Sequence, residues 1–261
     1  MTTVQLVASH RWRVPASPFE VLTDDDIRLR GTRLGDPDAS RPALVAAHGL
    51  MGWHRKPRFA AFCERLSAVY TVFAPDLRGH GESDGVSDYG GAEIWDIEGV
   101  VSRAREEGHT TVVSLGTSMG AIAAVRHAGL IGGVEEVVAI SCLAFWDWQG
   151  GAHPRVRAAF HARVRTSAGR AALRTWGVRL PQTWEPPEAP EEVAGKIAPT
   201  PLLVVHGRDD PLFAVEHAER LYAAASEPKR LLIGEPFGHA EDGLSPAFAD
   251  RLEREIDGLL P

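Results

Sequence analysis

The sequence has few cysteines and no long apolar run. Two of its 261 residues are cysteine, Cys63 and Cys142, and both lie in apolar stretches, which is typical of buried, reduced thiols. No stretch approaches the ~18 consecutive apolar residues that a membrane-spanning helix needs. The segment from Met1 to Pro15 lacks the basic start and apolar run of a secretory signal. We therefore expect a cytoplasmic protein with no membrane partner.

An excess of positive charge is also absent. The formal net charge is -7, from 35 acidic and 28 basic residues, and this mild acidic excess provides no overall attraction to nucleic acid. The apolar share of 44% and the charged share of 24% are ordinary for a globular protein. The length fits one α/β domain. Composition thus argues against disorder, a fibrous repeat or a nucleic-acid partner, and it leaves the oligomeric state open.

Common cofactor and metal motifs are missing as well. The sequence contains no phosphate-binding G-x-x-x-x-G-K-[ST], no nicotinamide fingerprint and no spaced set of cysteines and histidines. We expect no cofactor and no metal.

Short runs rich in valine, isoleucine, leucine and alanine alternate with stretches of helical length and period. This alternation is typical of a parallel sheet flanked by helices. Predicted strands are 43–47, 71–74, 111–115, 137–141, 202–206 and 230–233, with a weaker N-terminal hairpin from 19–23 and 27–33. Predicted helices are 59–67, 93–107, 119–128, 214–225 and 246–260. The fold class is therefore α/β with a mostly parallel sheet.

The alternation breaks between residues 143 and 198, which we interpret as a short inserted helical cap, with 1–142 and 199–261 forming the core. Four tryptophans lie in the insert: Trp146, Trp148, Trp176 and Trp184. The stretch from 153 to 184 contains no acidic residue and seven arginines: Arg155, Arg157, Arg163, Arg165, Arg170, Arg174 and Arg179. They form either a solvated helix face, whose charge is balanced by the acidic connector after it, or a basic cap that guides an anionic substrate.

The motif with the clearest chemistry is G-x-S-x-G, which spans Gly116 to Gly120 between a predicted strand and a helix of small residues. This context is that of a nucleophile elbow. Such a turn holds its serine in a strained backbone conformation and needs glycine where any side chain would collide with a neighbouring strand or helix. Ser118 is the predicted nucleophile, presented at the carboxyl edge of the sheet.

A serine hydroxyl needs a base within hydrogen-bond reach. Of the eleven histidines, His239 lies on the loop between the last predicted strand and the C-terminal helix, at the same sheet edge as Ser118. The base in turn needs a carboxylate to fix its tautomer. Asp209 and Asp210 both follow a predicted strand; Asp210 is our candidate, and Asp209 is predicted to be a turn or cap residue.

Acyl transfer also builds negative charge on the substrate carbonyl oxygen, which backbone N–H groups stabilise. One predicted donor is Met119, directly after the nucleophile. The other is Leu50, in a segment where Gly49 allows the chain to turn. The neighbouring His48 is predicted to be a structural loop residue rather than a second base.

Tryptophans are the candidate substrate-binding residues. Trp53 follows the glycine loop and is either ordinary packing or one wall of an acyl pocket, whereas Trp146 and Trp148 come from the predicted cap. Four tryptophans in a short cap favour an apolar pocket for a small or medium acyl or aryl group. The arginines leave room for a carboxylate or a phosphopantetheine-type group on the substrate.

Taken together, four features resemble the α/β-hydrolase superfamily and its small esterase-like members. They are the His48-Gly49 loop, D-x-x-G-H-G-x-S from Asp76 to Ser83, the elbow, and the late aspartate and histidine. The order Ser118, Asp210, His239 is the order that this fold uses, and the resemblance covers nearly the whole chain outside the cap. It implies the α/β-hydrolase fold and a structural role, near the mouth of the site, for the Asp76–Ser83 loop.

The resemblance also implies a serine hydrolase that cleaves a small-molecule carboxylic ester or thioester through an acyl-enzyme. Members of this superfamily use the same triad for acyl transfer, lyase and perhydrolase chemistry, and some resembling proteins are non-catalytic receptors. A complete triad disfavours the receptor alternative. Serine rather than aspartate at the elbow argues against haloalkane dehalogenases and epoxide hydrolases.

Overall fold

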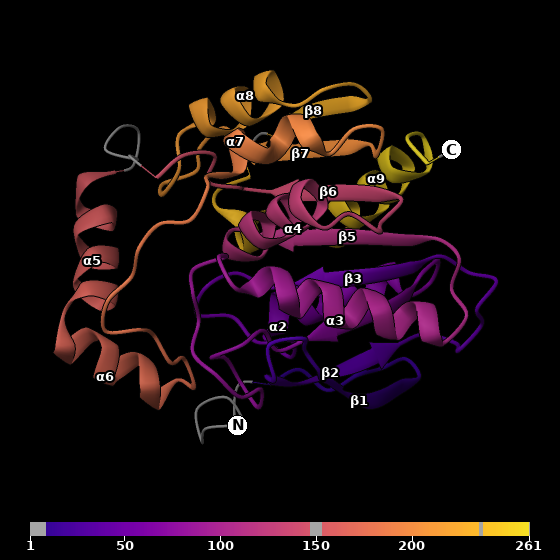
Figure 1. Cartoon of the computed structure of the whole chain (residues 1–261), viewed down its shortest axis with the longest axis horizontal. Coiled ribbons are helices and arrows are strands. Elements are labelled where there is room, and N and C mark those ends of the chain that lie inside the picture. The colour runs from indigo at the N-terminus through magenta and orange to yellow at the C-terminus, as the bar shows by residue number, and fades with distance from the viewer. Residues whose placement is uncertain (1–8, 147–152, 235–236, 261) are drawn as a thin grey trace.

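The computed structural model describes residues 9–146, 153–234 and 237–260, which contain an eight-stranded sheet with helices on both faces (Figure 1). The strands lie in the order β1-β2-β4-β3-β5-β6-β7-β8. From β4 onward in this order neighbouring strands are parallel, whereas β1 and β2 form an antiparallel hairpin and β2 pairs antiparallel with β4. The strands are β1 (Ala16–Leu22), β2 (Arg28–Leu34), β3 (Ala43–Ala47), β4 (Thr71–Pro75), β5 (Val112–Thr117), β6 (Glu136–Ile140), β7 (Leu202–Gly207) and β8 (Lys229–Gly234). Each predicted strand is present, with ends that match or are shifted by at most three residues, so the predicted fold class is confirmed.

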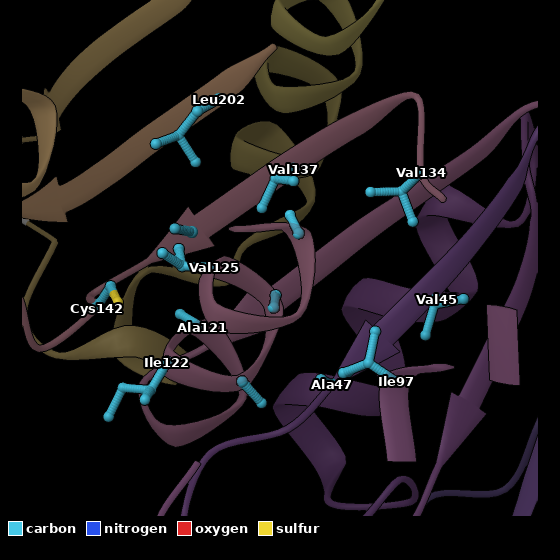
Figure 2. Packing of buried hydrophobic residues seen from close by; sticks show 14 of the residues in the cluster. Val45, Ala47, Ile97, Ala121, Ile122, Val125, Val134, Val137, Cys142 and Leu202 are labelled. Carbon is cyan, nitrogen blue, oxygen red and sulfur yellow. The ribbon is translucent and has the colours of Figure 1, made fainter. Parts of the chain in front are cut away.

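The central strands are buried on both faces because their alternate side chains enter two separate hydrophobic clusters. In β3, Val45 points to one cluster and Leu44 to the other. Helices α3 (Glu93–Glu106), α4 (Met119–Leu130) and α8 (Val215–Ala224) supply the first cluster, and α2 (Pro57–Leu66) and α9 (Pro246–Asp257) supply the second. Figure 2 shows Ile97 of α3 and Val125 of α4 among the residues of the first cluster.

Helix α4 follows the elbow and crosses the centre of the sheet. Every residue from Met119 to Ala128 is buried, which suits a helix made largely of small residues that lies between the sheet and its neighbouring helices. Cys63 and Cys142 belong to opposite clusters and are free, buried thiols, as their apolar sequence contexts predict.

Two further helices, α5 (Pro154–Arg165) and α6 (Ser167–Thr175), lie beside the sheet rather than over it (Figure 1). They form a small third cluster around Val164 and Leu173. The chain then returns through α7 (Pro190–Val193) and the 3-10 turn η1 (Ala194–Lys196). Val193 and Ile197 are buried with α4 and α8, so the end of the segment predicted as cap packs with the core.

The loop after β4 holds this α5–α6 segment in place. Arg179 donates its backbone N–H to the carbonyl of Gly79 at 2.7 Å and accepts from the N–H of Ser87 at 2.9 Å. Its guanidinium donates to the carbonyls of Ser83 and Gly85. Gly79 has φ +73, and a Cβ there would lie 2.3 Å from the Ser87 nitrogen. Only glycine allows this approach.

Asp76 organises the same loop from inside. Its carboxylate accepts the backbone N–H of His54 at 2.7 Å, the His54 Nδ1–H at 2.8 Å and the N–H of Glu82 at 2.9 Å. Burial alone would raise the pKa of Asp76, but the charge and hydrogen bonds of His54 lower it to about 2. These contacts give the residue the structural role that the family resemblance implies.

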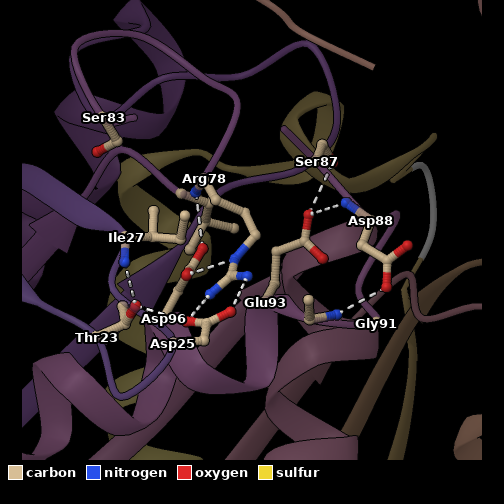
Figure 3. Close-up of polar contacts among 12 residues, drawn as sticks. Thr23, Asp25, Ile27, Arg78, Ser83, Ser87, Asp88, Gly91, Glu93 and Asp96 are labelled. Atoms are coloured by element: carbon tan, nitrogen blue, oxygen red, sulfur yellow. Dashed lines mark hydrogen bonds and ion pairs between the residues drawn. The ribbon is translucent and has the colours of Figure 1, made fainter. Parts of the chain in front are cut away.

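A partly buried ion network ties the first hairpin to α3 (Figure 3). The Arg78 side chain donates to Asp96 at 2.8 Å, and its other two nitrogens reach Asp25 in the β1–β2 turn at 2.5 and 2.8 Å. Burial raises the pKa of Asp96 to about 7 in spite of the guanidinium.

Within the three described ranges, no helix combines the length and apolar character needed to cross a bilayer.

Candidate active site

Ser118 occupies the sharp turn between β5 and α4. Its backbone has φ 53 and ψ -114, a region that non-glycine residues rarely adopt. Its N–H donates to the carbonyl of Ile140 at 2.8 Å. A Cβ at Gly116 would lie 2.1 Å from the carbonyl oxygen of Gly120, and one at Gly120 would lie 2.4 Å from that of Ala47. The collisions that the sequence predicted for the two glycines are therefore present.

His239 follows β8 and lies between Ser118 and Asp210. Its Nε2 is 2.9 Å from Ser118 Oγ, and its Nδ1 is 2.7 Å from Asp210 Oδ2. Because a carboxylate can only accept, Nδ1 carries the proton and Nε2 is left to accept the serine hydroxyl. The Oγ of Ser141 accepts the N–H of Ala240 at 2.9 Å, which fixes the loop next to the imidazole.

Asp210 is buried, and both of its oxygens have defined partners. Oδ1 accepts the N–H groups of Leu212 and Phe213 at 2.8 and 2.9 Å, while Oδ2 faces His239. The neighbouring Asp209 is exposed. The carboxylate is thus held by the turn that follows β7, and of the two candidates it is Asp210 that the structure brings to the imidazole.

Behind this carboxylate, His206 lies in β7 and is fully buried. Its Nε2–H donates to the carbonyl of Phe213 at 3.0 Å and lies 3.6 Å from Asp210 Oδ2. Burial lowers the pKa of His206, and its bond to the Phe213 carbonyl ties the ring to the turn that holds Asp210.

The loop after β3 packs directly against the serine. A Cβ at Gly49 would lie 3.2 Å from Ser118 Cβ. The Nε2 of His48 accepts the N–H of Leu77 at 3.1 Å, so Nδ1 carries the proton and donates to the Gly49 carbonyl at 2.9 Å. Burial lowers the pKa of His48 to about 4. A neutral His48 with both nitrogens engaged fits the predicted structural role.

A cavity of about 640 Å³ opens at these residues. Ser118 and His239 line it, as do the two predicted oxyanion donors, Leu50 and Met119. The cavity is large enough for a small organic substrate.

One wall of the cavity is aromatic. Trp184 packs edge-on against Trp146 and Tyr89, with ring centroids 5.2 and 5.3 Å apart. The indole N–H groups donate away to backbone carbonyls, Trp146 to Pro187 at 2.6 Å and Trp184 to Asp88 at 3.2 Å. With their polar atoms satisfied, the rings present apolar surface to the cavity.

The other predicted substrate-binding tryptophans have different positions. Trp53 is 3% exposed and donates its indole N–H to Ser9 Oγ at 3.1 Å; it packs away from the cavity lining, so the packing alternative fits. Trp148 lies outside the described residues. Sequence reasoning missed Tyr89, which lies in a loop without motif or period.

In the described part of the chain, no three histidine, cysteine or acidic side chains are grouped to hold a metal ion.

Comparisons with known proteins agree with this architecture. The model of the Alpha/beta hydrolase family matches residues 44–259. YfhR of Escherichia coli strain K12, described as uncharacterized, is 25% identical over 260 residues, which cover 94% of this chain and 81% of YfhR. YqkD of Bacillus subtilis strain 168, also described as uncharacterized, is 31% identical over 181 residues, or 67% of this chain and 57% of YqkD.

Two solved structures show the same fold. The esterase Pf2001 of Pyrococcus furiosus superposes with a TM-score of 0.76 at 20% identity, covering 97% of this chain and 98% of that one. The esterase RhEst1 of Rhodococcus sp. ECU1013 superposes with a TM-score of 0.68 at 20% identity, covering 93% and 99%.

Proposed function

Because this chain belongs to the α/β hydrolase family, we propose that it is a serine hydrolase that cleaves a small-molecule carboxylic ester or thioester. One observation carries the proposal: Ser118 Oγ, His239 and Asp210 form a hydrogen-bonded path, with steps of 2.9 and 2.7 Å, at the wall of a cavity. The esterases of Pyrococcus furiosus and Rhodococcus that share the fold support an ester as substrate. The buried free thiols support a reducing, cytoplasmic location.

In the first half of the reaction, Ser118 Oγ attacks the substrate carbonyl carbon while His239 Nε2 accepts the hydroxyl proton. The Asp210 carboxylate stabilises the imidazolium that forms. His239 then gives the proton to the leaving oxygen or sulfur, so an alcohol or thiol departs and the acyl group remains on Ser118.

The second half repeats these steps with water. His239 takes a proton from water, the resulting hydroxide attacks the acyl-enzyme, and the proton returns to Ser118 as the carboxylic acid leaves. In both halves the carbonyl oxygen becomes negatively charged. The backbone N–H groups of Leu50 and Met119 stabilise this charge, at about 3 kcal/mol for each donor.

The cavity favours an apolar acyl or aryl group. Trp146, Trp184 and Tyr89 provide flat surfaces with no unsatisfied indole donor, and burying apolar substrate surface there contributes about 25 cal/mol per Å². These residues form the substrate-binding wall in our proposal.

Labelling with a fluorophosphonate probe, followed by intact-mass measurement, tests the activated serine. We expect one adduct on the wild-type protein and none on Ser118→Ala. Ser102→Ala is the matched control, because Ser102 is exposed on α3 and its hydroxyl donates to Glu98; it should label normally. Equal labelling of Ser118→Ala, or no adduct on folded wild-type protein, would contradict the proposed function.

A further inference from the structure

Two of the seven arginines of the basic segment line the cavity. Arg165 is the last residue of α5, and Arg170 lies in the first turns of α6. Arg165 is exposed and Arg170 is half-buried. They belong to the same cavity as Ser118 and to the helices farthest from the sheet (Figure 1).

Neither of these cations has an acidic partner among the residues that the structure describes. No carboxylate oxygen among residues 9–146, 153–234 and 237–260 lies within 4.0 Å of the Arg165 or Arg170 guanidinium. The acidic residues of the same cavity are already paired: Glu241 with Lys56 at 3.0 Å, and Asp242 with Arg58 at 3.2 Å. The described part of the lining therefore holds uncompensated positive charge at the α5–α6 side.

The side chain of Arg170 is also oriented. Its Nη1 donates to the carbonyl of Arg165 at 2.8 Å and approaches that of Val164 at 3.4 Å. Since a guanidinium has five N–H donors, these bonds fix one edge and leave other donors for a ligand. The positive charges of both arginines act on Tyr89, where burial raises the hydroxyl pKa and the two guanidiniums oppose that rise. Arg165, Arg170 and Tyr89 all line the cavity, so both charges lie near its aromatic wall.

The position of Arg170 in its own helix supports a role in the cavity. The N-terminal end of a helix is its positive end, and a cation in the first turns is unfavourable there. The bonds from Arg170 to the α5 carbonyls offset part of this cost. These bonds do not explain why a second arginine, Arg165, lines the same cavity. An anion bound between Arg165 and Arg170 would compensate both charges.

We propose that Arg165 and Arg170 bind a carboxylate of the substrate, so that the ester cleaved at Ser118 carries an anionic group separated from the scissile bond by an apolar spacer. This inference rests on the proposed function and names its substrate class. The spacer packs against Trp146, Trp184 and Tyr89, while the carboxylate meets the two guanidiniums. The carboxylate stands on either the acyl or the alcohol side of the ester.

Matched pairs of esters test the proposal. The first series is the p-nitrophenyl monoesters of adipic, suberic and sebacic acids, each compared with the ester in which a carboxamide replaces the free carboxylate. Shorter diacids are avoided because their carboxylate attacks the neighbouring ester intramolecularly. A second series carries the same pair of end groups on the alcohol side of a butyrate ester.

For wild-type protein, we expect a roughly tenfold higher kcat/KM for the carboxylate ester than for its carboxamide in at least one series. Raising the salt concentration should reduce this preference by screening. Arg165→Gln and Arg170→Gln should each lower it severalfold and together abolish it, because kcat/KM for the carboxylate esters falls by more than kcat/KM for the carboxamide esters. Arg174→Gln is the control, because Arg174 is exposed on α6 and outside the cavity lining; it should keep the preference.

The proposal is overturned if esters are hydrolysed without any preference for the carboxylate, or if Arg174→Gln reduces the preference as much as Arg170→Gln. Failure of the proposed function gives a different result. In that case neither member of a pair is hydrolysed and the fluorophosphonate probe leaves Ser118 unlabelled, which removes both proposals together.

Discussion

Replacing Asp210 by asparagine tests the hydrogen-bonded path from Ser118 through His239 to Asp210. The substitution changes Oδ2, the atom that accepts the imidazole N–H. Oδ1 accepts two backbone N–H groups, from Leu212 and Phe213. The carbonyl oxygen of the new side-chain amide would keep these bonds, so its NH₂ group would occupy the place of Oδ2. That group donates to His239 Nδ1 and moves the ring proton to Nε2, which then donates to Ser118 instead of accepting from it.

The expected loss is large because the base is present in the wrong tautomer. We expect kcat/KM for p-nitrophenyl butyrate to fall about 10³- to 10⁴-fold, which corresponds to about 4–5.5 kcal/mol of transition-state stabilisation. Thermal unfolding should stay close to wild type, since the shape of the side chain and its two backbone bonds are conserved.

The exposed neighbour provides the control. Asp209→Asn changes the same charge one residue away and should leave kcat/KM within about twofold. A near-normal rate for Asp210→Asn, or an equal loss for Asp209→Asn, would refute the assignment of the carboxylate.

Three other substitutions test the packing that supports the site. Gly120→Ala places a Cβ 2.4 Å from a β3 carbonyl oxygen and should cost about 3 kcal/mol or more, read as a lower thermal midpoint. Burial raises the pKa of Glu136 from 4.5 to about 8, so the folded state loses stability as pH rises across that interval. Glu136→Gln should therefore stabilise the protein at about pH 8 by about 1–3 kcal/mol and much less at about pH 4, measured by urea unfolding. Arg78→Met leaves Asp96 without its buried partner and should cost about 3–5 kcal/mol, whereas Asp25→Asn, at a side chain that is 38% exposed, should cost less in the same assay.

The sequence predicted the parts of the site that depend on local rules. Gly116 and Gly120 were identified because a tight strand-to-helix turn excludes side chains, and the structure shows the close carbonyl contacts behind that rule. Ser118 is predicted from its G-x-S-x-G turn, and His239 and Asp210 are predicted from loops that follow strands at the same sheet edge. The structure brings the three side chains within hydrogen-bond distance of one another. Each of these predictions requires only that a strand, the turn after it and the direction of the strand be recognised in the sequence.

The cavity wall could not be predicted in the same way. Tyr89 has φ 55 and meets Trp184 across a long stretch of chain, and no local pattern encodes such a contact. In α5 only Val164 is buried, so its apolar period was too weak to show which arginines face the cavity. Trp53 follows the glycine loop closely, but proximity in sequence does not determine the side of the loop on which an indole packs.

The bonds between Arg179 and the loop after β4 attach the α5–α6 segment to the core at a place apart from Ser118, His239 and Asp210. Ser118, His239 and Asp210 follow strands of the sheet, whereas α5 and α6 reach the cavity from a segment that is fastened to Gly79, Ser83, Gly85 and Ser87. A mutation that loosens this fastening would let the arginine-bearing helices drift while the proton path stays intact. Under the proposed function, a change of substrate would therefore need changes in one attached segment alone, with Ser118, His239 and Asp210 left as they are.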